Sequence, residues 1–378
     1  MLRCLARHAR LLPRVNRGRY WISVQSGDEP YLPETTLHLQ FQAQGSNTFE
    51  PLTVTVVKRF EPFTSAAVLL VQRLSDDEMA ILKLADRRLG YRSGKGRPVP
   101  WSSSLEDRLR RAVHDIQAGV SLDRFELIRD VENRPDTKLW EDWMWEVSTW
   151  CYKLSSYNTE LAAYRLLHRL QGRYIPRLFG VVRLRITPES TPLPPITDVV
   201  QGLVFEYIPG VSMAKLKPGV DVPEQEAERI SSQVVEAFRA IEAENCVLHN
   251  DVHIGNVVLR EGNRCPVIID FGQADIREPE LSDEEWSGVV WGSPDTRYMR
   301  NSLLNPEDGP WKRTVTPYAM SDPHYKNALC FNQCVESMPE DFRRAMFERV
   351  LDTDWEGARE KVHQWRIRPG VRCRPIYD

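Results

Sequence analysis

The chain has 378 residues, of which 42% are hydrophobic and 27% are charged, a composition typical of soluble globular proteins. Its length exceeds the size at which one core usually stops growing, so we expect two domains or one two-lobed domain. The formal net charge of -3 gives no general attraction to nucleic acid, and no apolar stretch approaches the roughly 20 residues that span a bilayer. We therefore expect no nucleic-acid binding and no membrane span.

The N-terminal region is basic, and six arginines precede the first acidic residue, Asp28. They are Arg3, Arg7, Arg10, Arg14, Arg17 and Arg19. Their partly helical spacing among leucines resembles a mitochondrial transit peptide, although Pro13 would interrupt a helix. The alternative is a basic, flexible arm, and we assign residues 1–48 to it. The seven scattered cysteines are unlike a secreted disulfide framework, so we expect an intracellular protein, cytoplasmic by preference and mitochondrial if the arginines direct import.

Three short segments then have the alternation and β-branched content of strands: residues 52–59, 67–72 and 79–84. A polar turn separates the second segment from the third. The pattern predicts an antiparallel meander that ends in Ile81, Leu82 and Lys83.

From residue 86 to residue 157 the pattern predicts a helical insertion. Ser103 and Glu106 have the spacing of a capping box before an apolar helical stripe. Residues 139–154 repeat tryptophan and other apolar side chains at steps of three and four. We expect this tryptophan-rich face to pack against the sheet, and a groove for a protein partner is the alternative. A separate helix is predicted over residues 159–170.

Strands are predicted at residues 178–186 and 202–207, on either side of a proline-rich loop. Pro223 begins a strongly amphipathic helix. Ser282 and Glu285 form a second capping-box pattern and predict a further helix.

Residues 248–259 read LHNDVHIGNVVL, and this segment carries the strongest chemical signal. In a strand, His249, Asp251 and His253 would project to one side and could hold zinc or iron. A different chemistry is indicated by VIIDFG at residues 267–272. An aspartate directly after a buried strand, followed by a flexible glycine, is well placed to hold a divalent cation against phosphate oxygens.

His249, Asp251 and Asn256 have the spacing of the protein-kinase catalytic loop, and Asp270, with Phe271 and Gly272, matches the kinase metal-binding motif. The chain thus resembles the protein-kinase-like superfamily. The second histidine, His253, is typical of relatives that resemble aminoglycoside and choline phosphotransferases and of divergent fungal kinase-like proteins. The resemblance implies an α+β, two-lobed kinase-like fold. Its N-lobe, residues 49–208, would hold an antiparallel sheet with the helical insertion, and residues 209–378 would form a mainly helical C-lobe.

The resemblance also implies a set of upstream residues in the chain order of the superfamily. Lys83 would be the phosphate-binding lysine, and Glu160 would be its paired carboxylate. LVFEYIPG, residues 203–210, is similar to the strand that runs into the hinge. Phe205 would be the gatekeeper there, and backbone groups of Glu206 and Ile208 would meet adenine.

The function that the resemblance implies is an ATP-dependent phosphotransferase that moves the γ-phosphate to a hydroxyl of a protein or a small molecule. Asp251 would accept or orient the substrate hydroxyl, and His249 would support the loop. Asn256 and Asp270 would hold Mg²⁺, while Lys83 would anchor the α- and β-phosphates of ATP.

One departure from the superfamily pattern favours a rival function. The chain has no glycine between Gly45 and Gly90, where the glycine-rich phosphate lid should lie. The alternative is therefore a catalytically silent pseudokinase that binds a nucleotide or a protein partner. Asn250 replaces the catalytic-loop arginine of ordinary protein kinases, which argues against activation through a phosphorylated loop.

Overall fold

The computed structural model describes residues 30–94, 100–118, 128, 136–186, 195–292, 295, 296, 299, 303, 335, 336, 338–351 and 363–368. The N-terminal arginines and most of the proline-rich loop lie outside these residues. Among the helices of the described part of the chain, none is long and apolar enough to cross a membrane. The chain divides into two compact units. The first unit is Met1–Val211 with Val258–Ile276, and the second is Ser212–Val257 with Arg277–Asp378.

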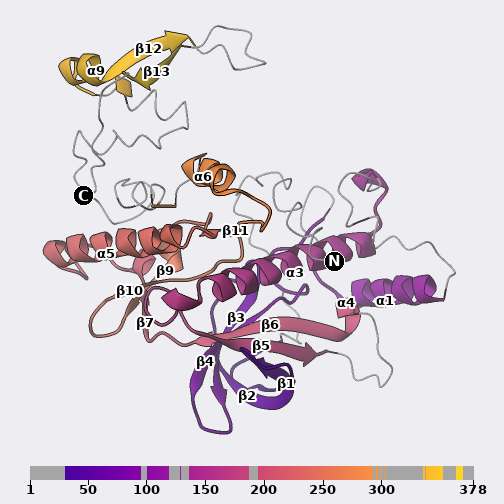
Figure 1. Ribbon diagram of the computed structural model, residues 1–378. Coiled ribbons are helices and arrows are strands. Elements are labelled where there is room, and N and C mark those ends of the chain that lie inside the picture. The colour runs from indigo at the N-terminus through magenta and orange to yellow at the C-terminus, as the bar shows by residue number, and fades with distance from the viewer. Residues whose placement is uncertain are drawn as a thin grey trace. The chain divides into compact units, whose positions relative to one another are not determined.

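The first unit is built on a six-stranded antiparallel sheet that closes into a barrel, in the order β1-β2-β3-β4-β6-β5 (Figure 1). Its strands are β1 Thr36–Ala43, β2 Glu50–Arg59, β3 Ala67–Arg73, β4 Met79–Leu84, β5 Leu178–Arg185 and β6 Val199–Glu206. The predicted meander is present as β2, β3 and β4, and both later strands are also present. Alternate side chains such as Val54, Leu69 and Leu82 fill the barrel because successive residues of a strand point to opposite faces.

Strand β1 differs from the expectation that residues 1–48 form a flexible arm. It pairs with β2 and with β5, and so it closes the barrel. The physical reason is the alternation of TLHLQFQA, which buries Leu37 and Leu39 in the barrel core. Ahead of the strand, the buried Tyr31 hydroxyl donates to Asp86 Oδ2 at 2.6 Å.

The insertion begins with helix α1, Ser103–Gln117. Its N-cap is Ser102, whose hydroxyl accepts from the Leu105 N–H, and not Ser103 as the sequence pattern suggested. Glu106 does not reach back to close a capping box, because its carboxylate accepts hydrogen bonds from Arg87 at 2.6 and 2.7 Å instead. A buried ion pair has therefore replaced the predicted cap.

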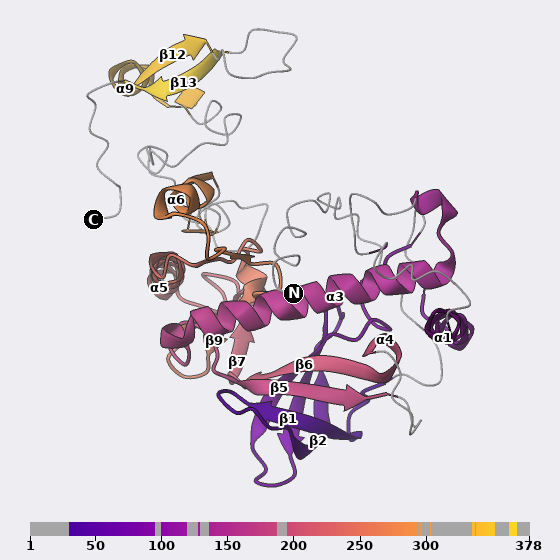
Figure 2. The same cartoon turned by 45° about the vertical axis from the view of Figure 1, so that its right-hand side comes forward.

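The two helices predicted around residues 139–170 are a single helix, α3, Asp142–Leu166 (Figure 2). No proline or glycine interrupts this stretch, so the helix continues through Ser155 and Ser156. Its tryptophan-rich first half packs against α1: Trp143 and Met144, with Trp140 just before the helix, share a cluster with Leu109 and other buried residues. These three side chains are thus covered within the chain itself, and a protein partner at residues 139–154, the alternative to packing against the sheet, stays a prediction.

Short elements complete the first unit: η3 Thr137–Leu139, η4 His168–Leu170, α4 Pro195–Asp198 and β11 Asp275–Ile276. A three-stranded sheet has the order β10-β9-β7, formed by β7 Gly210–Ser212, β9 Val257–Arg260 and β10 Pro266–Ile268. A Cβ on Gly210 would lie 2.0 Å from the Leu259 carbonyl oxygen, so β7 can approach β9 only with glycine at that position.

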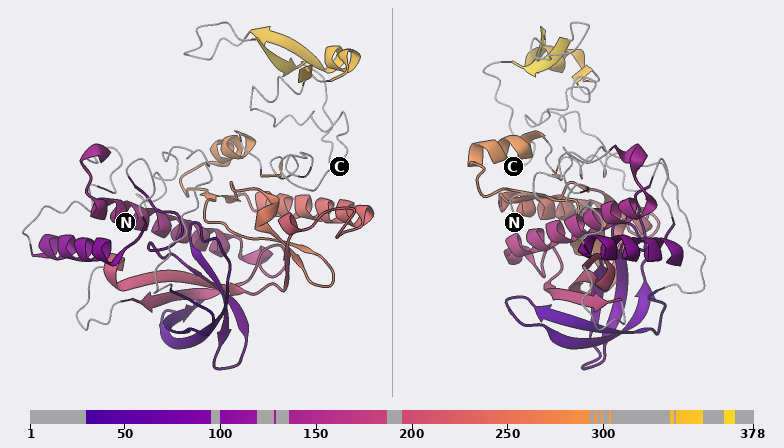
Figure 3. Two further views of the ribbon diagram at one scale, coloured as in Figure 1. Left: turned by 180° about the vertical axis from the view of Figure 1, so that it is seen from behind. Right: turned by 90° about the vertical axis from the view of Figure 1, so that its right-hand side faces the viewer.

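The second unit contains η5 Met213–Lys215, α5 Glu224–Ala243, β8 Val247–Leu248, η6 Ile254–Asn256, α6 Asp283–Gly292, α9 Glu340–Met346, β12 Phe347–Leu351 and β13 His363–Ile367. The predicted capping box before α6 is confirmed, since Glu285 N–H donates to Ser282 Oγ at 3.2 Å and Ser282 N–H donates to Glu285 Oε2 at 2.9 Å. The hairpin β12–β13 was not expected in a mainly helical lobe (Figure 3). Phe347 buries one face of it against Val335 and Met338.

Candidate active site

Lys83 lies at the centre of a buried charge cluster in the first unit. Along β4, Ala80, Leu82 and Leu84 belong to the barrel core, so alternation places Lys83 on the outer face. Its Nζ lies 2.7 Å from Glu160 Oε2 on α3 and 2.7 Å from Asp270 Oδ1. The side chains of Lys83 and Glu160 are 11% and 3% exposed, whereas that of Asp270 is 31% exposed. Three residues distant in sequence therefore meet at one ammonium group.

The electrostatics of this cluster favour an ionised lysine. Burial would lower the pKa of Lys83, but the charges of Asp270 and Glu160 outweigh it and raise that pKa above its ordinary value. Burial raises the pKa of Glu160, and the nearby Asp270 charge adds to this effect. Two carboxylates share one ammonium, so the cluster can accept a further cation, and the oxygen ligands of the partly exposed Asp270 suit Mg²⁺.

Asp270 and Gly272 have local geometries that their residue types allow. Asp270 has a φ of 68°, in the left-handed region that aspartate tolerates better than most residues. The Gly272 N–H donates to Asp270 Oδ1 at 3.4 Å. A Cβ on Gly272 would lie 2.4 Å from Ser156 Oγ, so only glycine lets this motif approach α3 so closely.

The predicted gatekeeper and hinge residues lie at the end of β6 in the same unit. Phe205 is buried, and its ring centroid lies 4.6 Å from that of Tyr164 on α3. Tyr164 also meets Phe271 edge-on at 5.5 Å. The Glu206 N–H donates to the Arg177 carbonyl at 2.8 Å and is not available to a ligand, and Ile208 is buried. The aromatic contacts connect the hinge strand, α3 and the metal-binding motif.

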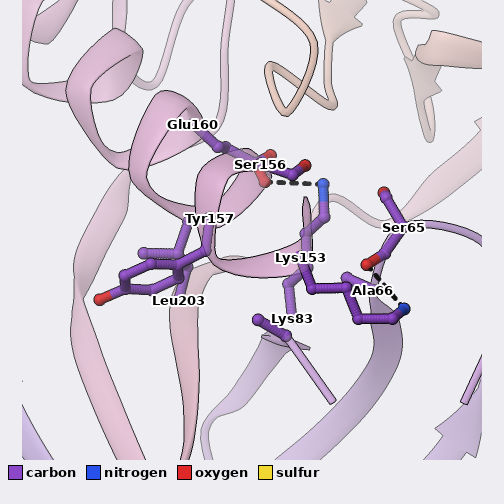
Figure 4. A pocket seen from close by; sticks show the side chains of 9 residues that line it. Ser65, Ala66, Lys83, Lys153, Ser156, Tyr157, Glu160 and Leu203 are labelled. Carbon is purple, nitrogen blue, oxygen red and sulfur yellow. Dashed lines mark hydrogen bonds and ion pairs between the residues drawn. The ribbon is translucent and has the colours of Figure 1, made fainter. Parts of the chain in front are cut away.

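A small pocket of about 10 Å³, roughly the space of one water molecule, lies beside Lys83 (Figure 4). Its walls combine apolar and polar residues, all of the first unit: Ser65, Ala66, Lys83, Ala85, Lys153, Ser156, Tyr157, Glu160 and Leu203. Two lysines and two serine hydroxyls supply hydrogen-bond donors, which suits an anionic group such as a phosphate.

The predicted catalytic loop belongs to the second unit. Backbone hydrogen bonds to one buried carboxylate stabilise its conformation. The N–H groups of His249 and Asn250 both donate to Asp295, the latter at 3.0 Å. Asn250 has a φ of 60°, which asparagine tolerates well. The His249 ring is fully buried, with its centroid 5.8 Å from that of Phe238 on α5. These contacts stabilise the conformation of the loop.

Asp251 and Asn256 lie together within this loop. Asn256 Nδ2 donates to the Asp251 carbonyl oxygen at 2.9 Å and to Asp251 Oδ2 at 3.3 Å. The Asp251 side chain is 20% exposed, so it can reach solvent or a ligand. His253 Nδ1 accepts from the Gly255 N–H at 3.0 Å and thereby caps η6. Its Nε2 lies 3.7 Å from Asp251 Oδ2.

The zinc or iron interpretation of this loop gains no geometric support. Among the described residues, no group of three or more histidine, cysteine, aspartate or glutamate side chains is arranged to hold a metal ion. Nδ1 of His253 accepts a backbone hydrogen bond as the cap of η6 and does not join a metal-ligand group.

Sequence reasoning missed two residues near these sites. Asp295 was not among the predicted site residues, and no local sequence pattern connects it to His249. Lys153 lines the pocket, and the supposed break between two helices hid its relation to Glu160. With α3 continuous, the two residues are seven positions apart and share a helical face.

Comparisons with known proteins agree with these motifs. A family model described as "Phosphotransferase enzyme family" matches residues 188–280, which include the hinge, the catalytic loop and the metal-binding motif. A serine/threonine-protein kinase D from Synechocystis sp. is 34% identical over 70 residues, covering 18% of this chain and 13% of the relative's length. The chain thus matches only a small part of that curated relative.

A crystal structure of the PknI kinase domain of Mycobacterium tuberculosis, a double mutant, is 19% identical. That match covers 66% of this chain and 71% of the other, with a TM-score of 0.30, which is too low to establish a shared fold.

The sequence matches support a relation of this chain to the protein-kinase-like superfamily. The segment that carries the predicted catalytic loop and the predicted metal-binding motif is the part that matches the phosphotransferase family model.

Proposed function

We propose that the chain is an ATP-dependent phosphotransferase that transfers the γ-phosphate to a hydroxyl of a protein or a small molecule. The observation that carries this proposal is the double ion pair of Lys83 with Glu160 and Asp270. Phosphoryl transfer needs a charged, oriented lysine next to a carboxylate that can bind Mg²⁺. The reason is that catalysis of this reaction depends on positioning and on nearby cations.

In this proposal Lys83 binds the α- and β-phosphates, and Asp270 and Asn256 are the Mg²⁺ ligands. Backbone groups of Glu206 and Ile208 other than the Glu206 N–H would receive the adenine. Bound Mg²⁺ would neutralise charge that develops on the phosphate oxygens.

Asp251 carries out the proton transfer. The acceptor hydroxyl oxygen attacks the γ-phosphorus, the bond to the β–γ bridging oxygen breaks, ADP leaves, and Asp251 takes the hydroxyl proton. The amide of Asn256 holds the Asp251 carboxylate in place through its 3.3 Å hydrogen bond. His249 and Asp295 position the loop but do not touch the reacting atoms.

The test is ATP hydrolysis and autophosphorylation by the purified chain with radiolabelled ATP and Mg²⁺. Asp251→Asn should lower either rate about 10²- to 10⁴-fold, the range expected for loss of a general base. The same substitution at the exposed Asp341 is the matched control. Hydrolysis that survives Asp251→Asn undiminished would refute the assignment of Asp251.

The absence of glycine from residues 46–89 favours one second candidate, a catalytically silent nucleotide-binding module. Such a module would bind ATP without turnover. Thermal unfolding with ATP and Mg²⁺ detects the binding that both functions share, since ligand at 100 times its dissociation constant adds about 2.7 kcal/mol to the free energy of unfolding. The assays of hydrolysis and autophosphorylation separate the two functions. A stabilised protein with no hydrolysis and no autophosphorylation would favour the silent module.

A further inference from the structure

Lys153 is a second buried lysine in the pocket beside Lys83. Its side chain is 1% exposed, and no carboxylate of the described residues lies within ion-pair distance of it. Lysine is rarely buried without such a partner because removal of an ammonium from water costs free energy. Lys153 is therefore a buried amine with no direct ion-pair partner among the described residues.

The Lys153 ammonium instead donates to two backbone carbonyls, Thr64 at 3.3 Å and Ser65 at 3.0 Å. Figure 4 shows the hydrogen bond to Ser65. Both belong to the turn between β2 and β3, residues 60–66, which occupies the chain position of the missing glycine-rich lid. The Thr64 carbonyl also accepts from the Tyr91 N–H at 2.9 Å, so it does not depend on Lys153. An ammonium has three donors, and only two hydrogen bonds are formed here. The two carbonyls therefore account for only two of the three N–H donors of Lys153.

Lys153 is also part of a polar face on α3. Lys153, Ser156 and Glu160 are spaced by three and four residues, so they lie on one side of the helix, and all three line the pocket. Each is buried. A helix face that packs on a sheet is normally apolar, and a row of buried donors around a pocket is better suited to an anionic ligand.

We propose that Lys153 is a second phosphate-binding cation of this pocket and supplies the donors that a glycine-rich lid would otherwise provide from its backbone. The ligand class is a nucleoside triphosphate, so the inference rests on the proposed function and deepens it. The β2–β3 turn presents the carbonyls of Thr64 and Ser65 on the side of Lys153, and bare carbonyl oxygens would repel phosphate oxygens. The ammonium covers them and offers its third donor to the phosphates.

The pKa of Lys153 reflects its burial without a direct ion-pair partner. Burial lowers the pKa of Lys153 to about 7, Asp86 opposes this shift, and Arg92 adds to it. A polyphosphate in the pocket would offset the cost of burial and favour the charged lysine.

The experiment measures the binding of adenosine, ADP, ATP and inorganic tripolyphosphate by calorimetry, with Mg²⁺ present. Lys153→Met should weaken ATP and tripolyphosphate binding about tenfold or more, as expected for loss of a charge-assisted hydrogen bond, and should leave adenosine unchanged. Lys138→Met, at an exposed position of the same unit, is the matched control. Thermal unfolding checks that each variant is folded.

Lys153→Gln separates charge from structure, because glutamine can still donate to the Thr64 and Ser65 carbonyls. For a phosphate-binding cation, this variant should bind ATP as weakly as Lys153→Met.

Wild-type affinity for ATP in either variant, together with weakened binding in Lys83→Met, would overturn the inference and leave the proposed function intact. Tripolyphosphate binding that depends on Lys153, in a protein that does not hydrolyse ATP, would support the site and refute the phosphotransferase. A wild-type protein that binds neither ATP nor tripolyphosphate would overturn both.

Discussion

Nζ of Lys83 lies 2.7 Å from Oε2 of Glu160, although the two residues belong to a strand and a helix with a whole insertion between them. Asp270 competes for the same ammonium at an equal distance. Glu160 therefore balances the attraction between Lys83 and Asp270. Without its negative charge, Lys83 would bind Asp270 more tightly and withdraw that carboxylate from Mg²⁺.

The first prediction concerns this balance. Glu160→Gln keeps the shape and one acceptor oxygen but removes the charge, so the protein should fold while the rate of phosphoryl transfer falls about tenfold or more. Steady-state ATP hydrolysis, measured as kcat/KM at several Mg²⁺ concentrations, checks the result. More Mg²⁺ should recover part of the loss because the ion then competes better for Asp270. Glu78→Gln, on an exposed turn, is the control. A fully active Glu160→Gln protein would contradict this account of the ion pair.

The second prediction follows from the close approach of Gly272 to α3. Gly272→Ala would place a methyl group 2.4 Å from Ser156 Oγ, and the overlap should reduce the free energy of unfolding by about 1–3 kcal/mol. Ser156→Ala removes that oxygen, while the remaining Ser156 Cβ lies at 3.7 Å, an ordinary contact distance. A contact of 3.3 Å with Asp270 Oδ1 would remain, so the double variant should regain most, but not all, of the stability lost in Gly272→Ala. Urea unfolding of the four proteins forms a double-mutant cycle, and additive losses would show that the clash is not the cause.

Local patterns predicted a large part of the barrel and of the charge cluster. The strands β2, β3 and β4 have short alternating sequences with turn residues between them, and each sequence alone determines which face is buried. Lys83, at the end of β4, was predicted from the resemblance to the kinase-like superfamily, and its ammonium lies beside Glu160 and Asp270. The alternation of Leu37, Leu39 and Phe41 in β1 was equally readable, but the basic residues before it led to its assignment to the arm.

Features that depend on tertiary contacts were less predictable. Glu106 has the right spacing for a capping box, yet the buried guanidinium of Arg87 offers it a stronger, charged partner. Asp295 supports His249 from a distance of 46 residues along the chain, and no local pattern encodes such a contact. Lys153 was overlooked because a break in α3 had been assumed where no helix breaker exists.

The third prediction concerns the buried ion pairs that join α1, α3 and the chain after β4. Arg87 donates to both Glu106 oxygens and to Glu146 Oε2 at 2.8 Å, and Arg92 pairs with Glu146 as well. Arg87→Met would leave Glu106 and Glu146 short of positive charge in a buried site. The free energy of unfolding should fall by about 3–5 kcal/mol, the usual cost of a broken buried pair.

Arg108→Met is the matched control for this prediction. Arg108 pairs with Asp142 at 3.1 Å and thus also joins α1 to α3, but both side chains are about half exposed. Exposed pairs contribute about 0–1 kcal/mol, so urea unfolding should show a small change. Equal losses for Arg87→Met and Arg108→Met would mean that burial of the Arg87 network does not matter for stability.

The last prediction is an acid-dependent loss of stability at Asp86. Burial would raise the pKa of this carboxyl, but the charge of Arg88 and hydrogen bonds from Arg88 and Tyr31 outweigh it and lower the pKa to about 2 from an ordinary 3.8. The unfolded chain therefore binds more protons at Asp86 between these two values. The contribution of Asp86 is complete above about pH 4 and is lost as the pH falls toward 2.

Asp86→Asn removes this pH dependence. At pH 6 the variant should be less stable than the wild type by about 2 kcal/mol, and by pH 3 about half of that difference should be gone, because protonated Asp86 resembles asparagine. Urea unfolding of both proteins at half-unit intervals between pH 6 and pH 3 measures the difference directly. Asp107→Asn, at an exposed position of α1, serves as the control. A difference between Asp86→Asn and the wild type that stays constant over this range would show that Asp86 titrates alike in the folded and unfolded chains, and the Tyr31–Asp86–Arg88 contacts would then contribute nothing specific to the charged carboxylate.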